Sequence, residues 1–207
     1  MKVRVFLFVV CLAFFSASSF AEWTEWKSNS RYNNVYTDIQ AHYYDSYDYT
    51  CDDKSGTVHE TTHGINAYLR NKYPKYNWFY VLNDRAFRLK LHNVKTLTQV
   101  ARAVPQQQRT STYKLYLVDQ ARYWNEIPSY ICDEWSAYHN GTLMAIDEFG
   151  PQSSRAKFSY SNMNEMYNFM LILSKLEGNN KDLEMFLQFA SAESKRIGQI
   201  INMGEAQ

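Results

Sequence analysis

Two histidines four residues apart, with a glutamate directly after the first, constrain this chain more than any other feature. The segment reads His59-Glu60-Thr61-Thr62-His63. Residues at this spacing lie on one face of an α-helix, so both imidazoles can bind the same zinc ion. Glu60 then lies beside the metal and can act as a general base on an attacking water. The sequence therefore predicts a helix over residues 58–71 that carries two ligands of a metal centre.

A capping box is the alternative interpretation of the same residues. In that arrangement Thr57 begins the helix, and Glu60 bonds back to the Thr57 backbone amide. His59 and His63 would then form an exposed helical face. This interpretation explains the glutamate but not the paired histidines, so we expect a metal site.

A catalytic zinc ion needs a third protein ligand and an open position for water. The extended motif with a third histidine is absent from the sequence, because Leu69 stands six residues after His63. The third ligand is therefore predicted to be a downstream carboxylate, and we expect Glu134, within a predicted helix over residues 129–145. The alternatives are Glu126, Asp133, Asp147 and Glu148.

The first 21 residues are typical of a secretory signal peptide. Lys2 and Arg4 supply a positive start, residues 5–15 are apolar, and Ser19-Phe20-Ala21 has the pattern of a cleavage site. The apolar run is shorter than the ~20 residues that a spanning helix needs. We therefore expect cleavage before Glu22, an exported protein that is periplasmic or secreted, and no stable membrane insertion afterwards.

The charge balance argues against a nucleic-acid partner. Loss of the first 21 residues changes the formal net charge from +1 to −1, because Lys2 and Arg4 are removed. Nucleic-acid-binding proteins need a basic excess, which this chain does not have. Residues 22–207 have the length of one domain with a hydrophobic core.

Two cysteines follow the predicted cleavage site. Cys11 lies in the signal peptide, so Cys51 and Cys132 are left in the exported chain. An oxidising compartment would join them in a disulfide, and two free buried thiols are the alternative. A disulfide would connect the segment before His59 to the segment around Glu134.

The remaining sequence patterns predict an α+β fold, with early strands followed by helices. Polar and tyrosine-rich residues alternate loosely over residues 22–50, which favours a strand or two there. A β-hairpin is predicted from residues 78–82 and 86–91, on either side of Asn83-Asp84. Helices are predicted over residues 97–104, 113–124, 129–145, 162–176 and 182–202.

The HETTHG stretch with a downstream helical glutamate resembles the zincin metallopeptidases of gluzincin type, and especially the small exported lethal-factor-like and Pro-Pro-endopeptidase-like group. The resemblance implies a zincin-like single domain: a small amino-terminal β-sheet with an edge hairpin, an active-site helix and a helical carboxy-terminal half. It implies a zinc-dependent metallopeptidase that hydrolyses a peptide or protein substrate. His59, His63 and Glu134 would hold Zn²⁺, Glu60 would be the base, and the hairpin would offer its edge to an extended substrate.

In that group a tyrosine seven residues before the ligand glutamate stabilises the transition-state oxyanion. Ile127 occupies this position here. Tyr130 and Tyr138, each one helical turn from Glu134, are the expected substitutes. Two other functions stay open: a catalytically silent zinc-containing module that recognises partners through tyrosine-rich residues 31–49, and a zinc hydrolase acting on a non-peptide amide.

Overall fold

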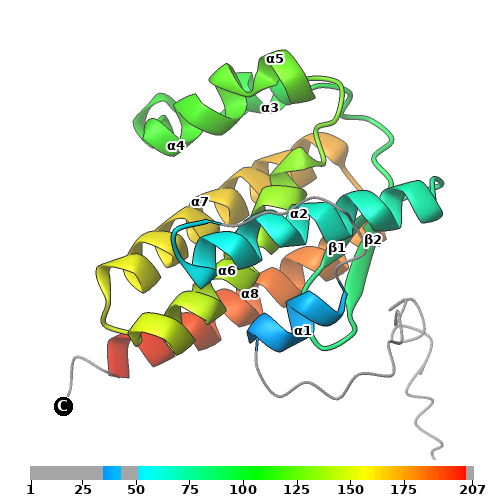
Figure 1. Ribbon diagram of the computed structural model, residues 1–207. Helices are drawn as coiled ribbons and strands as arrows, with labels where there is room; N and C mark the ends of the chain where they lie inside the picture. Colours follow the sequence, from blue (N-terminus) through cyan, green and yellow to red (C-terminus); the bar gives the residue numbers. More distant parts are fainter. Residues whose placement is uncertain (1–34, 43–50, 204–207) are drawn as a thin grey trace, which may run out of the picture.

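The computed structural model describes residues 35–42 and 51–203 of the chain (Figure 1). In this part of the molecule, helices surround a two-stranded antiparallel sheet, so the predicted α+β class is confirmed. The longer elements in chain order are α1 (Val35–Ala41), α2 (Lys54–Lys72), β1 (Asn77–Tyr80), β2 (Ala86–Leu89), α3 (Leu97–Ala103), α6 (Tyr130–Phe149), α7 (Ser154–Glu177) and α8 (Lys181–Met203).

Helix α6 is the central element of the core, because it packs against both α2 and α7, and α7 in turn packs against α8 (Figure 1). The largest cluster of buried apolar side chains joins α6, α7 and α8 to the hairpin and includes Trp135, Phe169 and Phe186. A second cluster joins α1 and α2 to the hairpin and includes Ile39, Ile65 and Leu69. Burial of such large side chains is the main favourable contribution to folding.

Helices α2 and α6 run antiparallel and approach each other closely. A side-chain carbon at Gly141 would lie 3.2 Å from the carbonyl oxygen of Ser55, so glycine permits this contact. At the other end of the pair, His63 of α2 contacts Asp133 of α6. The second half of α2 therefore lies beside the beginning of α6.

The predicted Cys51–Cys132 disulfide is wrong, because both cysteines are free in the structure. Cys51 lies just before α2, whose first turn packs beside Gly141. Cys132 is buried in α6 nine residues before Gly141, which corresponds to about 13 Å along the axis of α6. A disulfide requires Cα atoms within ~7 Å, so the antiparallel packing of α2 and α6 keeps the two thiols apart.

The predicted β-hairpin is confirmed, with a wider turn than expected. Asn77 pairs with Leu89 and Tyr80 with Ala86. Residues 82–84 form the turn and all have positive φ, between 55° and 65°. Asn83 and Asp84 tolerate this left-handed conformation better than most residues, whereas Leu82 does not.

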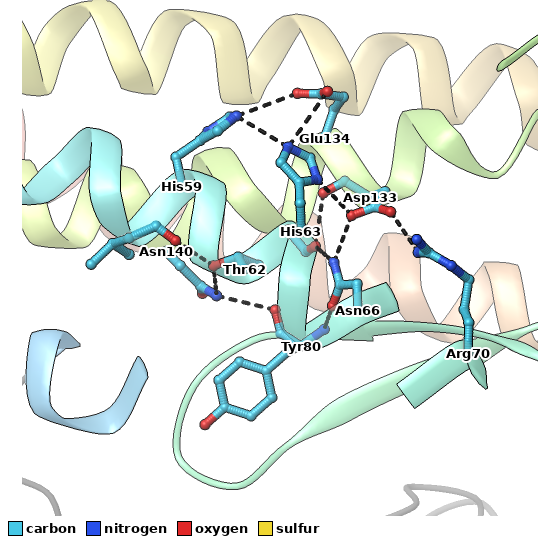
Figure 2. Close-up of polar contacts among 11 residues, drawn as sticks. His59, Thr62, His63, Asn66, Arg70, Tyr80, Asp133, Glu134 and Asn140 are labelled. Carbon is cyan, nitrogen blue, oxygen red and sulfur yellow. Dashed lines mark hydrogen bonds and ion pairs between the residues drawn. The ribbon is translucent and has the colours of Figure 1, made fainter. Parts of the chain in front are cut away.

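The outer edge of β1 is closed at its end beside α2 and α6. The outer edge of β1 is already occupied at Tyr80, whose backbone N–H donates to Asn66 (2.7 Å) and whose carbonyl accepts from Asn140 (3.2 Å). Figure 2 shows both amides reaching this strand from α2 and α6. A substrate strand could therefore not pair with Tyr80, and substrate pairing along the rest of this edge stays a prediction.

Helix α1 replaces a strand predicted within residues 22–50. Val35, Asp38, Ile39 and His42 recur at helical spacing, and Asp38, Ile39 and His42 are buried. Asp38 accepts a hydrogen bond from Tyr80 (2.7 Å), which ties α1 to the hairpin. The loose alternation of polar and aromatic residues concealed this helical period. The remainder of the tyrosine-rich segment lies outside the described residues.

The predicted helices after the hairpin are confirmed, and most extend beyond their expected bounds. Thr96 and Gln99 form a capping box at the start of α3, as threonine and glutamine at this spacing allow. The helix predicted over residues 113–124 is divided. It consists of α4 (Ser111–Tyr113), the π-helix η3 (Lys114–Asp119) and α5 (Ala121–Trp124), after a short 3₁₀ turn, η2 (Gln106–Gln108).

Among the described residues, no helix combines the length and the apolar character needed to cross a membrane. The predicted signal peptide lies outside the described residues, and export stays a prediction.

Glu177, at the end of α7, anchors the segment that follows β2. Its carboxylate accepts backbone hydrogen bonds from His92, Asn93 (2.9 Å) and Val94 (2.9 Å). Burial opposes ionisation of Glu177, but these three donors outweigh it and lower the pKa of the carboxyl group below 4.5. The ionised form therefore stabilises the fold.

We expect Glu177→Gln to lower the free energy of unfolding by about 1–3 kcal/mol at neutral pH, because charged acceptors make the stronger bonds. A carboxyl group whose pKa is lower in the folded state than in the unfolded state stabilises the fold fully at pH values above the unfolded-state pKa. This contribution is lost as the pH falls through the folded-state pKa. Urea unfolding should therefore show a smaller difference in free energy of unfolding between the wild type and Glu177→Gln at pH 3 than at pH 7. Glu184→Gln, at an exposed position on α8, is the control. An equal loss of stability at both pH values would contradict this account.

Candidate metal centre

Helix α2 begins earlier than the histidine motif, and this decides between the two interpretations of the motif. Asp53 is the N-cap residue, and its side chain accepts from the Gly56 backbone at 2.6 Å. Thr57 lies within the helix, where its backbone N–H donates to the Asp53 carbonyl (3.1 Å). The capping-box interpretation of Glu60 is therefore wrong, because Thr57 does not begin the helix.

His59, His63 and Glu134 converge on one point between α2 and α6, as Figure 2 shows. The two Nε2 atoms are 3.3 Å apart. Each lies 3.6 Å from a different carboxylate oxygen of Glu134. The three side chains that the sequence predicts as ligands are thus brought together from two helices that are distant in the chain, α2 and α6.

These separations fit a metal ion. Tetrahedral zinc with ligand bonds of about 2.0–2.1 Å needs ligand atoms about 3.3–3.4 Å apart. Glu134 is buried, and its Oε2 atom has no hydrogen-bond partner in the described part of the chain. A buried carboxylate oxygen without a partner is costly, and a cation between the three side chains would satisfy it.

The other nitrogen of His63 is held by Asp133. Its Nδ1 atom donates to the Asp133 carboxylate at 2.8 Å, which leaves Nε2 free to face His59 and Glu134. Burial alone would lower the pKa of His63, but the carboxylates of Glu134 and Asp133 raise it to about 9. The site is therefore strongly negative, and without a metal it holds a proton on this imidazole.

Sequence analysis missed the residues that support Asp133. Asn66 donates to its Oδ1 atom (2.7 Å) and Arg70 to its Oδ2 atom (2.6 Å). The charges of His63 and Arg70 outweigh burial and lower the pKa of Asp133 to about 2. Residues 63, 66 and 70 share one face of α2, and that periodicity is the signal that could have identified them.

The alternative third ligands do not reach this point. Asp133 binds the far side of His63 rather than facing Nε2. Glu126 lies exposed in the loop before α6, where it accepts from Asn125. Asp147 and Glu148 are exposed near the end of α6.

Two cavities open at this centre. The larger, of about 440 Å³, is lined by all three side chains, and the smaller, of about 430 Å³, is lined by His59 alone of the three. His59 and Glu60 line both. Glu60 is exposed, and it is the only carboxylate that α2 carries. The cavities leave room for water and for a ligand of extended shape.

Three tyrosines surround the centre, and one of them was not predicted. Tyr130 lines the larger cavity, Tyr138 lines the smaller, and Tyr116 lines both. The hydroxyl groups of Tyr116 and Tyr138 are 2.6 Å apart, and the Tyr138 ring meets His59 edge to face. Burial and the charge of Glu134 raise the pKa of Tyr138 to about 12. The same two causes raise the pKa of Tyr116 and of Tyr130, so all three stay neutral hydrogen-bond donors.

Tyr116 belongs to the π-helix η3, a form that often occurs at functional sites. No sequence signal separates it from the other tyrosines among the 17 in the chain.

A second group, Asp38, His42 and Asp84, also has potential ligand atoms within 4.8 Å of one another. Its polar atoms bond to each other and to Tyr80: His42 pairs with Asp84 at 2.7 Å, and Asp38 accepts from Tyr80. These bonds hold α1 against the hairpin turn.

Comparison of the chain with protein-family models, curated protein sequences and solved structures finds no match. The interpretation of the centre therefore depends on its own geometry.

Proposed function

We propose that this protein is an exported zinc-dependent metallopeptidase with a zincin-like fold. The observation that carries the proposal is the convergence of His59, His63 and Glu134 at the separations of a tetrahedral zinc site, with an unpartnered oxygen on Glu134. Glu60 lies on the open side of the same helix. This is the ligand-and-base arrangement of metal-assisted hydrolysis.

Zinc bound here would polarise a substrate carbonyl and lower the pKa of an attacking water. Glu60 takes the proton of that water and delivers it to the leaving amine. Tyr116, Tyr130 or Tyr138 donates a hydrogen bond to the developing oxyanion. Asp133 fixes the orientation of His63, and Asn66 and Arg70 fix Asp133.

A digest of a diverse peptide library tests the proposal. The zinc-loaded protein should cleave peptide bonds, and chelation should stop cleavage until zinc is restored. A protein that binds zinc tightly but cleaves nothing in the library would favour the silent binding module instead.

We expect Asp133→Asn to reduce zinc affinity by about 10–100-fold, because it removes the charged partner that orients His63. Competition with a zinc-binding dye measures this affinity. Asp147→Asn, at an exposed position on the same helix, should leave it unchanged. Equal affinities of Asp133→Asn and the wild type would show that His63 is positioned without this contact.

A further inference from the structure

A third cavity, of about 370 Å³, lies where the end of α2 meets the hairpin and the loop before α6. Four basic residues line it, Arg70, Lys75, Lys90 and Lys95, against one acidic residue, Glu126. The lysines come from three separate segments: the turn after α2, the end of β2 and the start of α3. For a chain with a net charge near zero, this is a marked local concentration of positive charge.

The lysines of this basic cavity carry charges that the fold does not neutralise. All three are exposed, and none forms an ion pair with a carboxylate of the described residues. The ammonium group of Lys75 lies 5.5 Å from the Tyr76 ring centre, and that of Lys95 donates to the His92 carbonyl. Neither contact balances a charge, so the cavity remains available to an anionic partner.

The basic cavity meets the larger cavity beside the metal centre at Arg70, which lines both. Arg70 lines three cavities: the basic cavity, the larger cavity beside the metal centre, and a narrow cavity between these two. Ile127 and Ser129 connect the narrow cavity to the basic one, whereas Trp124 and Tyr130 connect it to the metal centre. The narrow cavity has a volume of only about 20 Å³, room for a water molecule but not for a peptide. A peptide could therefore reach from one cavity to the other only past the side chain of Arg70, and we call the two open cavities with Arg70 between them the groove.

The length of this groove sets where its charge acts on a bound chain. Arg70 lies two helical turns after His63, about 10 Å along α2, and Lys75 lies beyond the end of the helix, up to about 18 Å away. An extended peptide advances about 3.3 Å per residue. A residue of the bound peptide that lies about three to five positions from the bond at the metal centre therefore reaches the basic cavity.

We propose that the basic cavity binds acidic residues of the peptide substrate, three to five positions from the cleaved bond on one side. The inference rests on the proposed peptidase function. Binding of acidic residues in the basic cavity makes the enzyme selective for acidic segments of the substrate, and the metal centre cleaves a peptide bond near each such segment. Opposite charges across such a groove set specificity and the rate of association more than the chemical step.

A library digest by zinc-loaded wild type, Lys75→Glu/Lys90→Glu and the control Lys175→Glu/Lys195→Glu tests the proposal. Lys175 and Lys195 are exposed on α7 and α8, outside the groove. Cleaved peptides should be enriched in Asp and Glu at these positions for the wild type and the control. The Lys75→Glu/Lys90→Glu enzyme should lose this enrichment.

Kinetics on a matched pair of library-derived peptides, one with acidic residues at these positions and one with glutamines, sharpens the test. Lys75→Glu/Lys90→Glu should raise KM for the acidic peptide by about 10-fold with little change in kcat, and added salt should narrow the difference. Cleavage without acidic enrichment, or with enrichment that survives the double substitution, overturns the proposal and leaves the peptidase function standing. Failure of the wild type to cleave any peptide overturns both.

Discussion

Glu60→Gln should lower the rate of peptide cleavage by about 10²–10⁴-fold, the usual cost of losing a general base. Glutamine keeps the size of the side chain and its hydrogen bonding but cannot accept the proton of an attacking water. Because Glu60 is exposed and is not one of the three converging side chains, zinc content and thermal stability should stay near those of the wild type.

Single-turnover cleavage of a library-derived peptide, together with metal analysis of the same preparation, measures this effect. Glu148→Gln is the matched control, since Glu148 is exposed on α6 and lines neither cavity at the metal centre. Near-normal cleavage by Glu60→Gln would remove Glu60 from the mechanism. A simultaneous loss of zinc would instead identify Glu60 as a ligand.

Glu134→Ala should abolish both zinc binding and cleavage. Loss of a partner behind a ligand typically costs about 10–100-fold in metal affinity, and loss of the ligand itself should cost more. Removing Glu134 also removes the carboxylate that lies 3.6 Å from each histidine Nε2 atom. This joint loss distinguishes Glu134 from Glu60, whose substitution should affect cleavage alone.

Glu126→Ala is the control for this variant, because Glu126 was the alternative ligand and lies exposed outside the centre. It should bind zinc and cleave peptides like the wild type. If Glu134→Ala retained zinc and Glu126→Ala lost it, the ligand assignment would be reversed. Circular dichroism of both variants verifies that helix α6 is intact.

The convergence of His59, His63 and Glu134 could be predicted from the sequence because the spacing of the two histidines has a direct physical meaning. Residues 59 and 63 face the same side of any helix, and an acidic residue on a second helix is the simplest way to complete the site. The choice of Glu134 over Asp133 needed the structure. Both residues are buried in α6, and only the packing of α6 on α2 decides which one faces the two Nε2 atoms.

Contacts between distant segments account for the predictions that failed. The disulfide was inferred from the positions of the two cysteines relative to the motif, but the antiparallel packing of α2 and α6 separates them. The contacts of Asn66 and Asn140 with the backbone of Tyr80 were likewise not predicted, because nothing in the sequence distinguishes these two helical asparagines from others. Helix α1 was missed because it is only seven residues long and because Asp38 and His42, two of the buried side chains in and directly after it, are polar.

Tyr116 shows a different limit. Its segment was predicted to be a helix, and it is helical, but the π-helical turn sets which side chains face the metal centre. A widened turn shifts every later residue around the helix axis. Composition and periodicity do not encode such a shift, so the tyrosine nearest to both cavities could not be selected from sequence.

Zinc titration of the metal-free protein tests the central claim most directly, with bound metal measured after equilibrium dialysis at micromolar free zinc. The wild type should bind a single zinc ion per chain, Glu60→Gln should bind the same amount, and His63→Ala should bind none. A folded wild-type protein that binds no zinc under these conditions would contradict the metal centre and the peptidase function that depends on it.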